Sequence, residues 1–290
     1  MSMPVTGGVP ATVGVLGGGR MGAGIAHAFL TAGSVVALVE RDQEQAAAAF
    51  GRLANAVHAS VGRGAVNEST AEIIARVRIS TSTRAFEACE LVIEAVPEDV
   101  GLKLESLARI EAVVAPATVV ATNTSSISVT ELGAGLSNAD RFLGLHFFNP
   151  VPASLLVEIV VGDETDPAVV TRAQGWVEAI GKTPVTVRDS PGFASSRLGL
   201  VIGLEAIRML EEGVASAADI DAAMVLGYKF PVGPLRLTDI VGLDVRLGIA
   251  EYLYQHLGER FAPPQLLRDK VAAGELGRKT GRGFFDWDAQ

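Results

Sequence analysis

Two ionisable residues interrupt the apolar stretch RFLGLHFFNPVPASLLVEIVVG, residues 141–162. His146 ends one strand-like run, and Glu158 interrupts the next run, LLVEIVV, which is otherwise typical of a buried strand. A buried charge is costly unless it is paired. If the two runs are antiparallel neighbours, His146 and Glu158 lie side by side, and the carboxylate can orient the imidazole for acid–base chemistry. The alternative is that Glu158 faces solvent from an edge and that His146 is an ordinary core residue.

A glycine-rich turn supplies a second signal, this time for a nucleotide. The segment VGVLGGGRMGAGIAHAF contains Gly17-x-Gly19-x-x-Gly22 directly after a strand and at the start of a helix. In dinucleotide-binding folds the first glycine allows a tight turn, the second lets a pyrophosphate approach, and the third lets the helix pack on the strand. The pyrophosphate then lies on the free N–H groups of the helix N-terminus, here at Arg20 and Met21.

Polar residues at two other strand ends extend this expected cofactor site. Glu40 ends the second strand, where an acid accepts hydrogen bonds from the adenosine ribose and disfavours a 2′-phosphate. Arg41 beside it could accept such a phosphate, but we expect a solvated side chain there, so the sequence predicts NAD rather than NADP. Asn123 and Ser125 follow a further strand in ATNTSSIS and should face the same crevice, although such clusters are more often turns or helix caps.

The composition narrows the class of protein. With 290 residues, of which 49% are hydrophobic and 20% charged, the chain is long enough for one large or two ordinary globular domains. A net charge of −9 argues against a nucleic-acid partner bound by phosphate neutralisation. No apolar run reaches the roughly 18 residues of a membrane-spanning helix, so no membrane partner is expected. The single cysteine, Cys89, fits a reducing compartment such as the cytoplasm, and no ligand spacing predicts a metal site.

Short β-branched runs alternate with helical runs in the first part of the chain. After a short tail without a signal-peptide pattern, strands are predicted over residues 11–17, 34–40, 75–82, 91–96, 118–122, 141–147, 155–161 and 185–187. Helices are predicted over residues 21–32, 42–61 and 100–114, and later over 193–212, 217–226 and 236–257. The pattern predicts an α/β fold, with a Rossmann-like doubly wound parallel sheet in residues 1–189 and an all-α domain in residues 190–290.

The motifs together resemble the L-3-hydroxyacyl-CoA dehydrogenases, especially the short bacterial 3-hydroxybutyryl-CoA type. The resemblance runs from about residue 11 to 287 through GVLGGGRMGAGIAHAF, LVIEAVPED, TNTSSIS, LHFFNPVP, SPGF, GYKFPVGPLRLTDIVGLD and LGRKTGRGFFDW. It implies oxidation of the 3-hydroxyl group of an acyl-CoA to a ketone with NAD as hydride acceptor, as in the β-oxidation of fatty acids. It also implies a helical second domain that carries much of a homodimer interface.

The resemblance assigns catalytic roles by position. His146 would be the general acid/base and Glu158 its orienting partner. Ser125 would hydrogen-bond the reacting oxygen. Ser196 stands where the family usually has an asparagine that completes the polar set around this oxygen, so a slower enzyme or a changed substrate is expected.

The resemblance also implies binding residues. Glu98 and Lys103 would contact the nicotinamide end of the cofactor, with Asn123 in the loop beside them, and Asn149 would join the substrate site. From the sequence alone, Glu98 and Lys103 are ordinary surface charges at a helix start. Arg63 would keep a basic contact to CoA.

Three departures from the family leave the substrate open. Besides Ser196, Leu155 stands where the family often has a lysine, and Ala56 stands at the place of a serine that binds CoA. The alternative reading is therefore an NAD-dependent dehydrogenase of a free hydroxy acid, such as a gulonate- or carnitine-like substrate. A non-catalytic dinucleotide sensor is a third reading, which the presence of both His146 and Glu158 disfavours.

Overall fold

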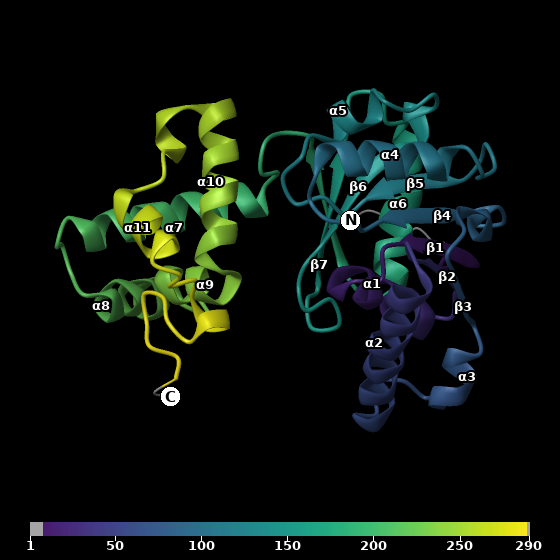
Figure 1. Cartoon of the computed structure of the whole chain (residues 1–290), viewed down its shortest axis with the longest axis horizontal. Helices are drawn as coiled ribbons and strands as arrows, with labels where there is room; N and C mark the ends of the chain where they lie inside the picture. Colours follow the sequence, from purple (N-terminus) through teal and green to yellow (C-terminus); the bar gives the residue numbers. More distant parts are fainter. Residues whose placement is uncertain (1–7, 289–290) are drawn as a thin grey trace, which may run out of the picture. The chain divides into compact units, whose positions relative to one another are not determined.

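The computed structural model describes residues 8–288 (Figure 1). Most of the expected N-terminal tail, residues 1–7, lies outside the described residues. The chain divides into two compact units, the first ending at Asp189 and the second beginning at Ser190. Each unit has its own hydrophobic core.

The first unit is built on one sheet of eight strands in the order β3-β2-β1-β4-β5-β6-β7-β8. The strands are β1 (Thr12–Leu16), β2 (Val35–Val39), β3 (Val77–Ser80), β4 (Leu91–Glu94), β5 (Val119–Thr122), β6 (Phe142–Phe147), β7 (Leu156–Val161) and β8 (Thr183–Arg188). Strands β1 to β6 pair in parallel, β7 runs antiparallel to β6, and β8 is parallel to β7. The predicted doubly wound sheet is therefore confirmed, with the direction reversed at its last two strands.

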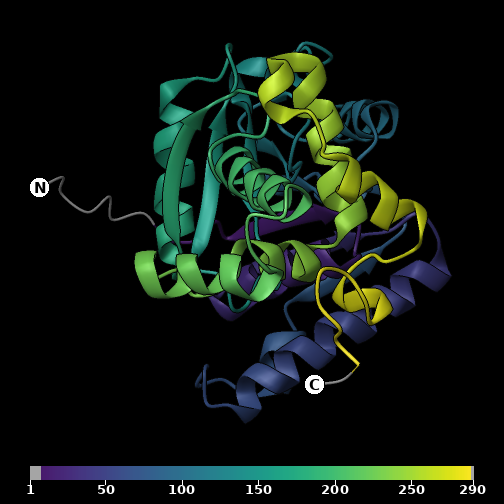
Figure 2. The ribbon, with the colours of Figure 1, turned by 90° about the vertical axis from the view of Figure 1, so that its left-hand side faces the viewer.

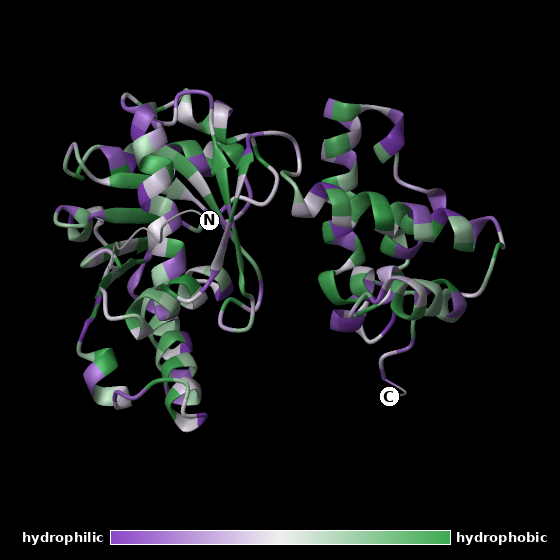
Figure 3. Ribbon diagram, turned by 180° about the vertical axis from the view of Figure 1, so that it is seen from behind, coloured by the Kyte–Doolittle hydropathy of each residue, from purple (hydrophilic) through white to green (hydrophobic). Residues whose placement is uncertain are grey.

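Helices connect the parallel strands and cover the sheet. They are α1 (Arg20–Thr31), α2 (Gln43–Gly62), α3 (Thr70–Ile74), α4 (Val100–Glu111), α5 (Val129–Gly133) and α6 (Pro167–Ala179). Hydrophobic residues concentrate on the strands of the sheet (Figure 3). On one face, Val15 and Ile93 share a buried cluster with Phe29 of α1 and Val177 of α6. This burial fixes the C-terminal ends of the strands relative to one another. The polar residues that follow these ends are therefore held in defined positions along one edge of the sheet.

The second unit consists of helices and loops, coloured green to yellow in Figure 2. Its helices are α7 (Ser195–Glu211), α8 (Ala217–Ala222) with a π-helical turn to Gly227, α9 (Pro234–Val241), α10 (Leu243–Leu257) and α11 (Gln265–Ala272). The prediction of a single helix over residues 236–257 is wrong. Gly242 has a φ of +107° and separates α9 from α10. An L-residue rarely adopts that conformation, so the break depends on glycine.

A buried aspartate fixes the end of the chain on this unit. Asp239 of α9 accepts hydrogen bonds from the backbone N–H groups of Phe284 and Phe285 and from Nε1 of Trp287, each at 2.9 Å. The motif LGRKTGRGFFDW is thus a loop tied to α9 through one carboxylate.

Candidate active site

His146 and Glu158 form a buried pair on neighbouring strands. They are direct partners in the antiparallel register of β6 and β7, and Nδ1 of His146 lies 2.8 Å from Oε2 of Glu158. Their exposed fractions are 6% and 1%, so the alternative of a solvent-facing Glu158 is wrong. A carboxylate can only accept here, so Nδ1 carries the proton, and the other ring nitrogen, Nε2, is the basic one. The pair has the geometry of a general base with its orienting carboxylate.

The glycine turn has the backbone conformation and close packing predicted from the spacing of its glycines. Gly17 has a φ of +92°, and a Cβ atom on Gly22 would lie 1.8 Å from the carbonyl oxygen of Gly17. A Cβ atom on Gly19, in contrast, would meet no atom within 4 Å. Open space therefore lies where the backbone must admit a pyrophosphate, at the N-terminus of α1 with Arg20 and Met21 in its first turn. The turn fits a dinucleotide.

Glu40 is held directly against this turn. Its Oε1 accepts a 2.7 Å hydrogen bond from the backbone N–H of Gly18. Arg41 is exposed and pairs with its neighbour Asp42, which confirms the solvated side chain expected there. Arg52 of α2, which was not predicted as a site residue, donates from Nε to the carbonyl oxygen of Gly18 at 2.9 Å. Nothing in its local sequence singles it out, because only the packing of α2 beside the turn brings it there.

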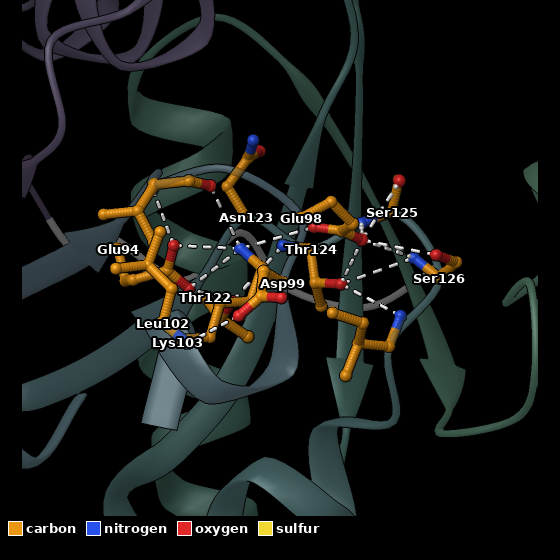
Figure 4. A network of polar contacts seen from close by, with 12 residues as sticks. Glu94, Glu98, Asp99, Leu102, Lys103, Thr122, Asn123, Thr124, Ser125 and Ser126 are labelled. Atoms are coloured by element: carbon orange, nitrogen blue, oxygen red, sulfur yellow. Dashed lines mark hydrogen bonds and ion pairs between the residues drawn. The ribbon is translucent and has the colours of Figure 1, made fainter. Parts of the chain in front are cut away.

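A loop after β5 is organised by one carboxylate (Figure 4). Oε1 of Glu98 accepts hydrogen bonds from the Thr124 hydroxyl at 2.6 Å and from the backbone N–H groups of Ser125 and Ser126 at 2.9 and 3.2 Å. The hydroxyl groups of both serines also approach it, each at 3.3 Å. Glu98 therefore sets the position of the Ser125 hydroxyl, for which the family resemblance implies a contact with the reacting oxygen.

Lys103 is not the surface charge that the sequence alone predicted. Its side chain is 1% exposed, and Nζ contacts both carboxylate oxygens of the buried Glu94, at 2.9 and 3.1 Å. The same Nζ lies 3.3 Å from Oε2 of Glu98. Burial acts to raise the pKa of Glu98, but the Lys103 charge and the hydrogen bonds from Thr124 and Ser125 outweigh it and lower this pKa. Glu98 is thus held ionised, as an acceptor for the loop.

Asn123 links the two strand ends that carry the candidate residues. Its Oδ1 accepts a 2.9 Å hydrogen bond from the backbone N–H of Phe147, the residue after His146. Its own N–H donates to the carbonyl oxygen of Glu94. The structure therefore brings Asn123, Glu98 and Lys103 together around the ends of β4, β5 and β6, at the edge where doubly wound sheets bind ligands.

The expected CoA residues line a surface groove beside α2. One hollow of about 430 Å³ is lined by Ala56, Ala59, Arg63, Pro150, Pro152 and Ala153. A second, of about 330 Å³, shares three of these residues and adds Arg20, Arg52, Asn55 and Asn149, among others. We call the two hollows together the α2 groove. Its three arginines suit an anionic ligand, since guanidinium groups bind phosphates well.

A buried lysine shapes the wall of the α2 groove. Nζ of Lys182, before β8, donates to the carbonyl oxygens of Val151 and Ser154, at 2.6 and 2.5 Å. Lys182 thereby fixes the turn after the HFFNP motif, a role that no sequence motif indicates. Leu155, the departure noted from the family, is 70% exposed directly after this turn.

Ser196 belongs to the second unit. It lies in the first turn of α7 and is half-buried. Its role near the reacting oxygen remains a prediction.

The sheet, the glycine turn and the buried imidazole–carboxylate pair define the class as a dinucleotide-dependent dehydrogenase. Comparison with known proteins narrows this class. Residues 12–190 match the family model of the 3-hydroxyacyl-CoA dehydrogenase NAD-binding domain, and residues 192–287 match the model of the C-terminal domain of the same enzymes. The chain belongs to the 3-hydroxyacyl-CoA dehydrogenase family, and its cofactor is NAD.

Individual relatives agree with this assignment. The chain is 39% identical over 276 residues to a probable 3-hydroxybutyryl-CoA dehydrogenase of Bacillus subtilis, covering 94% of this chain and 96% of that protein. It is 39% identical over 279 residues to a 3-hydroxybutyryl-CoA dehydrogenase of Mycobacterium tuberculosis, covering 95% and 98%. The crystal structure of (S)-3-hydroxybutyryl-CoA dehydrogenase from Ralstonia eutropha matches with a TM-score of 0.92 and 40% identity, over 96% of this chain and 99% of that one. The described part of this chain contains no helix long and apolar enough to cross a bilayer.

Proposed function

We propose that the protein interconverts a short-chain 3-hydroxyacyl-CoA and the corresponding 3-ketoacyl-CoA with NAD, with 3-hydroxybutyryl-CoA as the reference substrate. The observation that supports this most directly is the buried contact of 2.8 Å between His146 and Glu158. The relatives named above act on CoA thioesters and favour this substrate class over the free hydroxy acid. The α2 groove, with Arg63 and Asn149, is the proposed place of the CoA moiety.

In the oxidative direction, Nε2 of His146 takes the proton of the substrate 3-hydroxyl group. The Glu158 carboxylate stabilises the imidazolium that results. The hydroxyl groups of Ser125 and Ser196 donate hydrogen bonds to the developing oxyanion. NAD, when bound, supplies the acceptor for the hydride that leaves C3. In the reverse direction His146 returns its proton to the ketone oxygen.

The geometry of the first unit supports the following cofactor contacts. Gly17 and Gly22 shape the turn and Gly19 leaves room for the pyrophosphate, with the N–H groups of α1 as its donors. The Glu40 carboxylate accepts from the adenosine ribose. Glu98 contacts the nicotinamide end of the cofactor. Lys103 holds the Glu98 carboxylate in place through their ion pair.

The test is a spectrophotometric assay of the purified protein with NADH and acetoacetyl-CoA, following loss of the reduced-nicotinamide absorbance. Parallel reactions use NADPH in place of NADH, free acetoacetate in place of the thioester, and the His146→Ala variant. We expect turnover only with NADH and the thioester, abolished in the variant. Turnover of free acetoacetate but not of acetoacetyl-CoA would replace this proposal by the free hydroxy acid reading.

We also propose a homodimer formed through the second unit, in a reducing compartment such as the cytoplasm. Large apolar side chains of this unit are exposed, among them Leu198 at 61%, Leu226 at 71% and Tyr228 at 75%. Exposed apolar surface of this kind marks association sites. Sedimentation equilibrium of the wild type and of Leu226→Glu tests it: the wild type should have twice the chain mass, and the variant should dissociate more readily. A monomeric wild type would contradict the dimer.

A further inference from the structure

Arg52 of α2 is attached to the glycine turn through one atom of its guanidinium group. Nε donates a hydrogen bond of 2.9 Å to the carbonyl oxygen of Gly18. Within residues 8–288 the side chain makes no other hydrogen bond or ion pair, although arginine carries five N–H donors. The residue is exposed, and it lines the smaller hollow of the α2 groove together with Arg20. The use of Nε alone indicates a directional contact with the backbone.

Gly18 is held at both polar groups of its backbone. Its N–H donates to Oε1 of Glu40 at 2.7 Å, and its carbonyl oxygen accepts from Arg52. Helix α2 also packs directly against this glycine, because a Cβ atom on Gly18 would lie 2.3 Å from Cβ of Ala49. Ala49 lies three residues before Arg52 and therefore on the same face of α2. Gly18 is thus fixed between the end of β2 and α2.

The contact with Arg52 also fixes the next N–H group of the turn. The carbonyl group of Gly18 and the N–H group of Gly19 belong to one planar trans peptide unit and point in opposite directions. With the carbonyl group directed at Arg52, the N–H of Gly19 points away from α2. No described group accepts a hydrogen bond from this N–H, and the space beside Gly19 is open. Gly19 is the N-cap of α1, so its N–H lies next to the donors at the helix start.

We propose that Arg52 is a positioning residue for the cofactor. Its Nε holds the Gly18–Gly19 peptide in the orientation that presents the N–H of Gly19 to the NAD pyrophosphate. Arg52 acts through the backbone of the turn, and its positive charge is not what the cofactor requires. The ligand concerned is NAD, so this inference does not depend on which substrate the enzyme oxidises.

The composition of the turn explains why such a contact matters. Gly17, Gly18 and Gly19 are consecutive, and glycine has more backbone freedom to lose than any other residue. A turn that is already ordered before the cofactor arrives avoids this loss on binding. Arginine suits the task, because its planar guanidinium group gives the Nε–H bond a fixed direction.

The alternative role for Arg52 is direct attraction of a phosphate by its charge, which guanidinium groups do well. Three substitutions separate the two roles. Arg52→Gln keeps an N–H donor on the atom bonded to Cδ, where arginine has Nε, and removes the charge. Arg52→Lys keeps the charge and places a methylene group there. Arg52→Met keeps neither the donor nor the charge.

The first measurement is the dissociation constant of NADH, followed by nicotinamide fluorescence of the full-length protein. We expect Arg52→Gln to stay within about twofold of the wild type. Arg52→Lys and Arg52→Met should each weaken NADH binding by about tenfold, the range for one lost hydrogen bond with a charged donor. Arg172→Met is the matched control, because Arg172 is an exposed arginine of α6 that donates to a backbone carbonyl, that of Ala117, outside the turn. This control should keep the wild-type affinity.

The second measurement examines the turn without cofactor. Amide hydrogen exchange of the peptide that covers residues 17–23 should be faster in Arg52→Lys and Arg52→Met than in the wild type, and unchanged in Arg52→Gln and Arg172→Met. Both measurements are independent of turnover. If the wild type reduces no acyl-CoA, the proposed function fails, and NADH binding still decides about Arg52.

Three results would overturn the positioning role. Wild-type NADH affinity in both Arg52→Lys and Arg52→Met would show that the turn does not need the contact. Wild-type affinity in Arg52→Lys with a loss in Arg52→Gln would assign Arg52 to phosphate attraction by charge. Equal losses in all three variants would show that a donor at the place of Nε is not sufficient. If Arg52→Met does not fold, the comparison of Arg52→Gln with Arg52→Lys still separates these outcomes.

Discussion

Lys103 and Glu94 form an ion pair that solvent reaches from neither side, with Nζ 2.9 and 3.1 Å from the two carboxylate oxygens and exposed fractions of 1% and 0%. The pair stands behind Glu98, which in turn organises the loop that carries Ser125. A buried pair is thus connected to the proposed oxyanion contact through one further carboxylate.

Replacing Lys103 by methionine should destabilise the protein. The variant leaves the Glu94 carboxylate buried without its cation, at a cost of about 3–5 kcal/mol in the free energy of unfolding. Urea unfolding followed by circular dichroism measures this loss. The double variant Glu94→Gln/Lys103→Met is the control and should recover most of the stability, because no buried charge remains. A single variant as stable as the wild type would show that Glu94 does not depend on Lys103.

Replacing Glu158 by glutamine should impair catalysis and spare cofactor binding. The amide keeps the shape of the side chain but cannot stabilise an imidazolium as a carboxylate does. With a charged hydrogen bond at about 1.5–3 kcal/mol, kcat should fall by about 10- to 100-fold. The dissociation constant of NADH, from nicotinamide fluorescence, should not change. In the His146→Ala background the same substitution should cause little further loss, and a full additional loss there would contradict the coupling of the two residues.

The glycine turn offers a comparison between two of its own positions. Gly22→Ala should compromise folding, since its Cβ would lie 1.8 Å from the Gly17 carbonyl oxygen. Gly19→Ala should fold normally because its Cβ meets no atom, yet it should weaken NADH binding by about tenfold or more, since the methyl group occupies the space for the pyrophosphate. Gly51→Ala, in open space on α2, is the control for both stability and binding. Wild-type NADH affinity in Gly19→Ala would place the pyrophosphate elsewhere.

His27 should make the stability of the protein depend on pH. It is buried on α1 with Nε2 2.9 Å from the Ser60 hydroxyl, and its pKa is lowered, first by burial and then by the charges of Arg63 and Lys182. Below the ordinary histidine pKa of 6.5, the unfolded chain binds a proton that the folded chain does not, so the free energy of unfolding falls as the pH drops from 6.5 toward the lowered pKa. Above pH 6.5 His27 is neutral in both the folded and the unfolded chain, so its protonation no longer lowers the free energy of unfolding.

Urea unfolding of the wild type and of His27→Gln, on both sides of pH 6.5, measures the effect. The variant should show a smaller loss of stability on the acid side, whatever its stability on the basic side. Identical slopes for the two proteins would exclude His27 as the titrating group. His58, exposed on α2, provides the control substitution His58→Gln, which should keep the wild-type slope.

The sequence by itself determined the sheet domain, the glycine turn and the pairing of His146 with Glu158. These features depend on short-range periodicity and on residues whose conformational demands are strict. A glutamate inside an otherwise apolar strand is buried and therefore needs a hydrogen-bond partner. His146 on the neighbouring strand could be predicted as that partner. The break between α9 and α10 could also have been predicted from Gly242, since glycine is the usual residue at a positive φ.

Only the tertiary structure decided where the other charges are. Lys103 looks like a surface residue because it lies near the start of a helix, close to Glu98 and Asp99 in the sequence, yet the adjacent strand end places the buried Glu94 opposite it. Arg52 and Lys182 are likewise unremarkable in their local sequence, and their positions depend on which helix or turn packs beside them. Periodicity tells which face of an element is buried, but the neighbour that this face meets depends on contacts between residues far apart in the chain. The partner of a buried charge is therefore a property of the fold.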